Sequence, residues 1–392
     1  MLKNIYKHFA NRSLKLTKNL KIVILRKKRH FRLFEQISAS APFLSKFDSM
    51  NLDFNRRLSI APMLDCTDRH ERYFLRLISK HVLLYSEMVV ASGLLHCDNT
   101  DMFLGHEAFE HPAVLQLGGN DPTDLARASK LVEAAGFQEV NLNCGCPSDR
   151  VQNGNFGACL MKSKGLVADC FKAMQDAVSI PVSIKCRIGV DEFDSWEFFT
   201  NFIQTIKDAG CNLFIIHARK AWLKGLSPKE NREVPPLHYD FVHRLKSEMP
   251  DLNLSINGGI KTLDQVEEQL KDLNGVMVGR EAYENPWFLH DADERIFGDL
   301  RPTSSDPAEI IAGKARPATR KALLEAYLPY VEKETSNGCP ATILVKHLYG
   351  LFAGLPGARK YRQVLSNESP RAKEQGGAVA LIRKAMDLVV EE

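Results

Sequence analysis

The sequence lacks a long apolar run. Its longest early one, Ile22–Leu25, falls far short of the roughly 20 residues that span a bilayer. It also lacks the regular cysteine pairing of small secreted scaffolds, because its 9 cysteines are scattered over 392 residues. In so long a chain, scattered cysteines indicate free thiols in a reducing compartment. We therefore expect a cytoplasmic protein without a membrane partner.

Acidic residues are missing from residues 1–34, which are rich in Lys and Arg and include the run Arg26-Lys27-Lys28-Arg29. A transit peptide has this composition and would make the protein organellar. A basic arm that helps to hold RNA is a second interpretation. A third is that the segment is dispensable and that Met50 is the true start. We expect residues 1–55 to be a disordered extension outside the fold.

The composition excludes little else. Hydrophobic residues make up 44% of the chain and charged residues 26%, which is typical of a soluble globular protein. The formal net charge of +4 is mild and does not by itself demand a nucleic-acid partner. The length suits one large domain followed by a smaller one.

Short apolar runs alternate with helix-length segments from Leu58 onward. The runs are near-continuous in apolar residues, as expected for parallel strands that are buried on both faces. They are Leu58–Ala61, Leu83–Met88, Ala113–Leu117, Glu139–Asn143, Val182–Arg187, Leu213–Ala218, Leu254–Asn257 and Gly275–Gly279. The expected helices between them are Pro122–Ala135, Gly165–Val178, Trp196–Ala209, Leu237–Glu248 and Thr262–Lys271.

This alternation predicts an α/β fold, a (β/α)8 TIM barrel over residues 56–305. A doubly wound open sheet is the rival, but the G-x-G-x-x-G turn typical of it does not occur. Beyond the Pro-bearing linker Arg301–Pro307, helical patterns at Thr319–Thr335, Ala341–Phe352 and Ala378–Val390 predict a small all-α domain over residues 306–392.

Polar or glycine-rich features stand at nearly every predicted strand end, where barrel enzymes gather their chemistry. They are Pro62-Met63-Leu64, Glu87, Gln116, Asn143 to Cys146, Lys185, His217, Asn257-Gly258-Gly259 and Gly279-Arg280. The last two follow the seventh and eighth strands, the usual phosphate site of this fold. Glycines there allow backbone amides to approach an anion closely.

The segment from Asn141 to Ser148 contains Cys144 and Cys146. A structural zinc site is disfavoured because no second close cysteine pair follows, and a disulfide across one residue would be strained. A nucleophilic cysteine needs a neighbouring base. A general acid needs only a protonated thiol, and a free cysteine with a pKa near roughly 8.5 has one. Cys146, on the loop before Pro147, is the better candidate, and Cys144 can be ordinary packing.

Lys185 and His217 each have a structural alternative. Lys185 lies inside an apolar strand and needs a partner, which could be Glu87 in a core ion pair. His217 ends the run Leu213–Ile216 and could be a satisfied buried residue. Their positions at strand ends favour a functional role.

Taken together, four motifs resemble the tRNA-dihydrouridine synthases. These are Asn143-x-Gly145-Cys146-Pro147-Ser148, Gly157-Ala158-Cys159-Leu160, Lys185-x-Arg187-x-Gly189 and His217-Ala218-Arg219. The segments 217–232 and 350–359 are similar to the A-type branch, which acts on uridines 20 and 20a of the D-loop. The basic N-terminal extension departs from that pattern.

The resemblance implies an oxidoreductase that uses FMN, with NADPH as reductant and tRNA as substrate. Separately, we expect a monomer without a metal. Cys146 would be the proton donor and Asn143 would position the uracil. FMN would contact Pro62, Met63, Leu64, Gln116, Lys185 and His217, with its phosphate at Asn257, Gly258, Gly259, Gly279 and Arg280.

Two basic pairs resemble the tRNA-orienting set of the family, namely Lys229 with Arg232 and Arg359 with Arg362. Solvated surface is the commoner role of such side chains. A flavin barrel that reduces a free pyrimidine, like a dihydroorotate dehydrogenase, is the main alternative, and the helical C-terminal domain argues against it. A non-enzymatic RNA chaperone is a third hypothesis.

Overall fold

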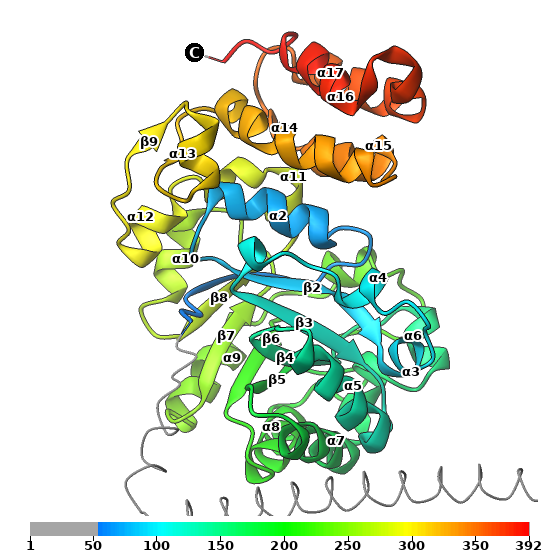
Figure 1. The fold of residues 1–392 in the computed structure, drawn as a ribbon. Coiled ribbons are helices and arrows are strands. Elements are labelled where there is room, and N and C mark those ends of the chain that lie inside the picture. The colour runs from blue at the N-terminus through cyan, green and yellow to red at the C-terminus, as the bar shows by residue number, and fades with distance from the viewer. Residues whose placement is uncertain (1–53, 392) are drawn as a thin grey trace, which may run out of the picture. The chain divides into compact units, whose positions relative to one another are not determined.

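The barrel is the central feature of the computed structural model, which describes residues 54–391 (Figure 1). Eight parallel strands close on themselves in chain order, and β8 pairs with β1 at Leu58 and Val276. The strands are β1 (Leu58–Ile60), β2 (Leu83–Val90), β3 (Ala113–Gly118), β4 (Glu139–Cys144), β5 (Val182–Arg187), β6 (Leu213–His217), β7 (Asn253–Asn257) and β8 (Gly275–Val278). The predicted TIM barrel is confirmed.

Helices follow the strands on the outside of the barrel. The longer ones are α2 (Arg69–Ile78), α5 (Pro122–Ala134), α7 (Lys164–Ala177), α8 (Trp196–Asp208), α9 (Tyr239–Glu248) and α10 (Leu263–Gln269). The shorter ones are α3 (Ala91–Leu95), α4 (Asp101–Leu104), α6 (Asp149–Asn153), α11 (Arg280–Glu284) and α12 (Ala292–Phe297). Local signals explain their starts: the Asp121 side chain accepts from the N–H of Asp124 ahead of Pro122, and Thr262 and Gln265 form a capping box.

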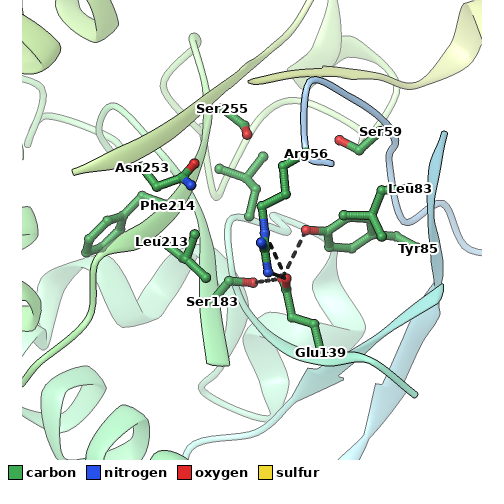
Figure 2. A pocket seen from close by; sticks show the side chains of 11 residues that line it. Arg56, Ser59, Leu83, Tyr85, Glu139, Ser183, Leu213, Phe214, Asn253 and Ser255 are labelled. Atoms are coloured by element: carbon green, nitrogen blue, oxygen red, sulfur yellow. Dashed lines mark hydrogen bonds and ion pairs between the residues drawn. The ribbon is translucent and has the colours of Figure 1, made fainter. Parts of the chain in front are cut away.

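The amino-terminal end of the barrel is closed by a buried ion pair (Figure 2). Arg56 donates from Nη2 to Glu139 Oε2 at 2.7 Å, and the Glu139 carboxylate is fully buried. Tyr85 and Ser183 donate their hydroxyls to the same carboxylate. Only a cavity of about 10 Å³ remains, which has room for a single water. This end of the barrel is therefore filled.

The chain continues into a helical region. It comprises α13 (Pro307–Ile311), α14 (Arg320–Ser336), α15 (Ala341–Val345), the 3-10 helix η6 (Lys346–Leu348), α16 (Ala358–Glu368), the 3-10 helix η7 (Ser369–Gln375) and α17 (Gly377–Met386). The sequence predicted no helix at α16. The linker contains the short strand β9 (Thr303–Ser304), which pairs with β10 (Arg316–Pro317) beyond α13.

Helix α14 packs on α2 of the barrel, as Figure 1 shows. The rings of Tyr73 and Tyr330 stack there with centroids 3.8 Å apart. The residues from Phe54 onward cluster as one compact unit, so a boundary at residues 305 and 306 stays a prediction. The predicted extension lies almost wholly outside the described residues. None of the helices within residues 54–391 combines the length and apolar character needed to cross a bilayer.

Candidate active site

The strand register brings the predicted polar residues to one rim of the barrel. Asn143 lies beside Lys185 across β4 and β5. His217 lies between Arg187 on β5 and Asn257 on β7. Because parallel strands end at the same edge, residues far apart in the chain become neighbours there.

A chain of amides sets the orientation of Asn143. Asn143 Nδ2 donates to Gln116 Oε1 at 2.8 Å, and Gln116 Nε2 donates to Asn141 Oδ1 at 2.7 Å. Asn143 Oδ1 then accepts from the backbone N–H groups of Gly145 and Cys146, both at 3.0 Å. Asn143 therefore fixes the turn that carries Cys146.

Cys146 is partly exposed, and its thiol donates to Ser148 Oγ at 3.4 Å. The downstream motif holds its backbone, because Ala158 N–H donates to Cys146 O at 2.9 Å. Gly157 has a φ of +68°, and a Cβ there would meet Cys146 O at 2.6 Å. Cys144 is fully buried, and burial raises the pKa of its thiol well above the ordinary range. Cys144 is core packing, as the sequence allowed.

Arg187 joins this turn to the loop after β6, a role that the sequence reasoning did not assign. Its buried guanidinium donates from Nε to Gly145 O at 2.9 Å. Nη1 donates to Lys220 O at 2.9 Å and to Asn231 O at 3.0 Å. An arginine at the end of an apolar strand was the available signal, since burial of its charge requires such partners.

Lys185 is bound to Asn257, because its Nζ donates to Asn257 Oδ1 at 3.1 Å. The alternative of a core ion pair with Glu87 is wrong, since Glu87 accepts from the backbone of Asp65 instead. Burial, followed by repulsion from Arg187, lowers the pKa of Lys185 to about 8. An anion beside Lys185 would raise its pKa again, because it would stabilise the charged form of the side chain.

Cations converge on His217. Burial lowers the pKa of His217 well below its ordinary value, and the charges of Arg187, Lys185, Arg219 and Arg232 lower it further. The imidazole is therefore neutral at physiological pH, and the positive field around it favours an anionic ligand.

Two positions after β7, Gly258 and Gly259, have no room for a side chain because neighbouring side chains pack directly against their backbone. Gly258 and Gly259 have φ values of +120° and +75°. A Cβ on Gly258 would lie 2.8 Å from His217 Cδ2. The backbone can approach a ligand here only because both positions lack a side chain.

The loops after β1 and β8 meet beside these glycines. A Cβ on Gly279 would lie 3.6 Å from Met63 Sδ, so the two loops are in contact range. Arg280 pairs with Glu233, and its Nη2 donates to Arg232 O at 3.4 Å. Pro62 and Met63 are partly buried, whereas Leu64 is 62% exposed. Loops after β1, β6, β7 and β8 thus meet at the carboxyl-terminal end of the barrel strands, and this end of the barrel is called the opening below.

The four basic residues predicted to orient tRNA form two separate groups. Lys229 and Arg232 are exposed at the 3-10 helix η4 (Glu230–Arg232) beside the opening. Arg359 and Arg362 are exposed one turn apart on α16, which packs against α17 and η7.

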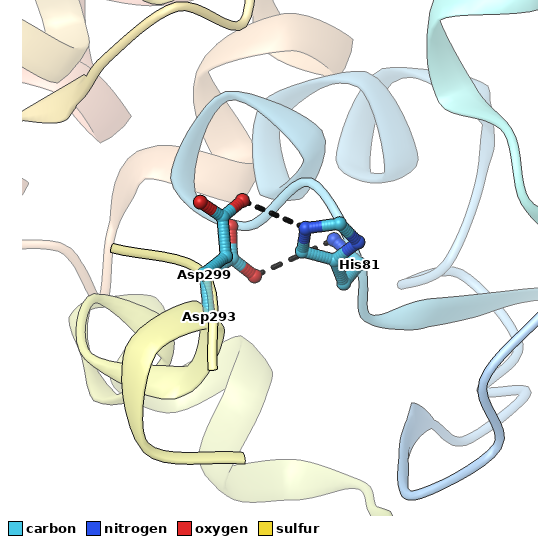
Figure 3. Close-up of side chains that lie close together, drawn as sticks. All are labelled: His81, Asp293 and Asp299. Carbon is cyan, nitrogen blue, oxygen red and sulfur yellow. Dashed lines mark hydrogen bonds and ion pairs between the residues drawn. The ribbon is translucent and has the colours of Figure 1, made fainter. Parts of the chain in front are cut away.

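A different polar cluster, His81 with Asp293 and Asp299, has the composition of a metal site (Figure 3). Arg301 already pairs with both carboxylates, from Nε to Asp299 Oδ2 at 2.7 Å and from Nη2 to Asp293. Lys80 N–H donates to Asp293 Oδ2 at 2.8 Å. These donors already occupy the carboxylate oxygens, and the cluster fastens the linker to the segment after α2.

Comparison with known proteins gives concordant matches. Residues 59–387 match the family described as "Dihydrouridine synthase (Dus)". A tRNA-dihydrouridine(20/20a) synthase from Salmonella typhi is 51% identical, over 86% of this chain and 96% of its own length. Proteins of the same name from Escherichia coli (strain K12) and Shewanella oneidensis are 50% and 51% identical, over 88% and 87% of this chain and 95% and 96% of their own lengths.

Proposed function

The chain belongs to the dihydrouridine synthase family, and from that premise we propose that it reduces uridine to 5,6-dihydrouridine in tRNA, at positions 20 and 20a of the D-loop. The observation that carries the proposal is a linkage within the rim. Asn143 and Arg187 bind the Cys146 turn to the same strand ends that hold Lys185 and His217. The candidate proton donor and the strand ends with the buried cations therefore belong to one hydrogen-bonded rim, which supports the proposal.

We assign a flavin mononucleotide to this rim. Gly258 and Gly259 pack so closely against His217 and Leu237 that neither position has room for a Cβ, which leaves their backbone amides uncovered by a side chain of their own. With Gly279 and Arg280 they would hold the phosphate. Lys185, Gln116 and His217 would face the ring system, with Pro62, Met63 and Leu64 beside it. The cations around His217 fit a ligand that carries a phosphate and accumulates further negative charge on reduction.

The flavin, when bound, supplies a hydride to uracil C6 and takes its electrons from NADPH. The thiol of Cys146 would donate a proton to uracil C5. Asn143 holds the backbone of Cys146 and would position the uracil. Negative charge that develops toward uracil O4 is stabilised by the cationic rim. The target base has to leave the RNA stack to reach this slot.

Lys229 and Arg232 would contact the RNA backbone at the opening, and Arg359 and Arg362 would contact it from the helical region. Both groups are exposed, as phosphate contacts require. Such contacts fix the orientation of an RNA without reading its bases. The separation of the two groups favours a large folded RNA over a free pyrimidine.

The test uses the purified chain with FMN, NADPH and an unmodified tRNA transcript. We expect dihydrouridine at positions 20 and 20a and none when NADPH is left out. Transcripts with cytidine at both positions are the matched control for the site of reaction. Turnover of free uracil or orotate without tRNA would support the dehydrogenase alternative. A colourless protein that binds tRNA and no flavin would support an RNA chaperone.

A further inference from the structure

The loop between β1 and α2 is a tight turn that carries Met63 into the candidate site. The N–H groups of Cys66 and Thr67 donate to Met63 O at 3.1 and 3.0 Å, and Met63 N–H donates to Thr67 Oγ1 at 3.0 Å. Asp65, at the tip, has a φ of +62°. Aspartate adopts this left-handed conformation more readily than most residues other than glycine, but the conformation is still uncommon, and outside contacts stabilise it here.

Both backbone polar groups of Asp65 are held by other parts of the chain. Its N–H donates to the carboxylate of Glu87 on β2. Its carbonyl accepts from Lys346 Nζ at 3.0 Å, and Lys346 begins η6 in the helical region. The tip of this loop is therefore clamped between the barrel and an element 281 positions later in the sequence.

Lys346 is itself well anchored. Its Nζ lies 2.9 Å from Asp68 Oδ2, and its side chain is 28% exposed. The next residue, His347, is fully buried and lies 3.0 Å from a carboxylate oxygen of Asp68 on one side and of Glu71 on the other. The backbone that presents Lys346 is thus fixed to the start of α2.

We propose that Lys346 is a positioning residue of the flavin site, through which the C-terminal helical region holds the Pro62-Met63-Leu64 loop against the ring. This inference rests on the proposed function only in so far as that function assigns the loop to the flavin. It makes the helical region part of the cofactor site in addition to any role in RNA binding.

The competing explanation is that Lys346 only fastens the helical region to the barrel. A second ion pair between these parts separates the two explanations. Lys333 on α14 pairs with Glu107, which caps the 3-10 helix η2 (Ala108–Glu110) far along the chain from the loop. Loss of Lys333 removes a fastening contact and leaves the loop at Asp65 untouched.

The experiment compares Lys346→Met, Lys346→Arg and Lys333→Met with the wild type. Apoprotein is titrated with FMN to obtain the dissociation constant, and the visible spectrum of the bound flavin is recorded without tRNA. We expect Lys346→Met to weaken FMN binding about tenfold and to shift the flavin bands, as the loss of one charge-assisted hydrogen bond allows. Lys346→Arg retains the donor and the charge, so it restores both readouts. Lys333→Met leaves both unchanged.

The outcomes separate this inference from the proposed function. Equal FMN dissociation constants and spectra for wild type and Lys346→Met overturn the inference, as does an equal loss in Lys333→Met. A wild type that binds FMN but makes no dihydrouridine overturns the proposed activity and leaves the Lys346 comparison valid. A wild type that binds no FMN overturns both.

Discussion

The buried His347 predicts a specific dependence of stability on pH. Its side chain is 0% exposed, and its ring nitrogens lie 3.0 Å from carboxylate oxygens of Asp68 and Glu71. Burial alone would lower its pKa, but the hydrogen bonds and charges of Asp68 and Glu71 outweigh burial and raise the pKa to about 9. Burial also raises the pKa of Glu71, so Glu71 and His347 compete for one proton. The carboxylate oxygens of Asp68 and Glu71 on either side of the ring favour the proton on His347.

The sign and size of the effect follow from the difference between folded and unfolded states. A pKa raised from 6.5 to about 9 means that the folded chain binds the proton more tightly. The stabilisation is therefore complete below about pH 6.5, declines as the pH rises, and is lost above about pH 9. At about 1.4 kcal/mol for each pKa unit, it amounts to about 3 kcal/mol.

The assay is urea unfolding of the wild type and of the double variant Glu71→Gln/His347→Gln at about pH 6 and about pH 9. The double variant removes both the imidazolium and the buried carboxyl, so no unpaired Glu71 with a raised pKa titrates in it. We expect the difference in free energy of unfolding to shrink by about 3 kcal/mol at the higher pH. Taking the difference removes groups that titrate in both proteins, such as Lys185 with its pKa near 8. A difference that stays constant across this range would refute the imidazolium assignment.

Three further outcomes are expected. Cys146→Ala lowers uridine reduction about 10²–10⁴-fold in single-turnover assays, whereas flavin reduction by NADPH measured by absorbance stays the same, because only proton donation is lost. The double variant Arg359→Ala/Arg362→Ala raises KM for tRNA with little change in kcat, and its binding shows a salt dependence weaker by about two phosphate contacts. Arg56→Met leaves Glu139 buried and unpaired and destabilises the fold by about 3–5 kcal/mol in urea titrations. Adding Glu139→Gln recovers much of that loss, and failure to recover would contradict the role of charge.

Every barrel strand could be predicted because a parallel strand buried on both faces leaves an unbroken apolar run, as in Leu213–Ile216. Helix α16 was missed for the opposite reason. It buries only Ala358, Tyr361 and Leu365 along its length, so its apolar periodicity is sparse, and the glycines before it favoured an irregular segment.

The polar positions of the candidate site could also be predicted, since each stands where an apolar run ends. Their partners could not. Lys185 meets Asn257 through the registers of β5, β6 and β7, 72 positions apart, and no local pattern encodes those registers. The same holds for His347, whose partner Asp68 lies 279 positions earlier. The sequence indicates which residues could bind or react, because their type and their place at the end of a strand can be read directly. It does not indicate their hydrogen-bond partners, because those come from distant elements that meet only when the barrel closes.

The plugged end of the barrel has a kinetic consequence. Arg56 and Glu139 block passage along the barrel axis from its amino-terminal end. A ligand therefore reaches the strand ends that carry Lys185 and His217 from the opposite end of the barrel. Under the proposed function, a nicotinamide and an extruded pyrimidine both reach the flavin from that one end, and we expect them to bind there one after the other. Initial velocities measured while both concentrations are varied are then expected to fall on parallel lines in double-reciprocal plots, as in a ping-pong mechanism.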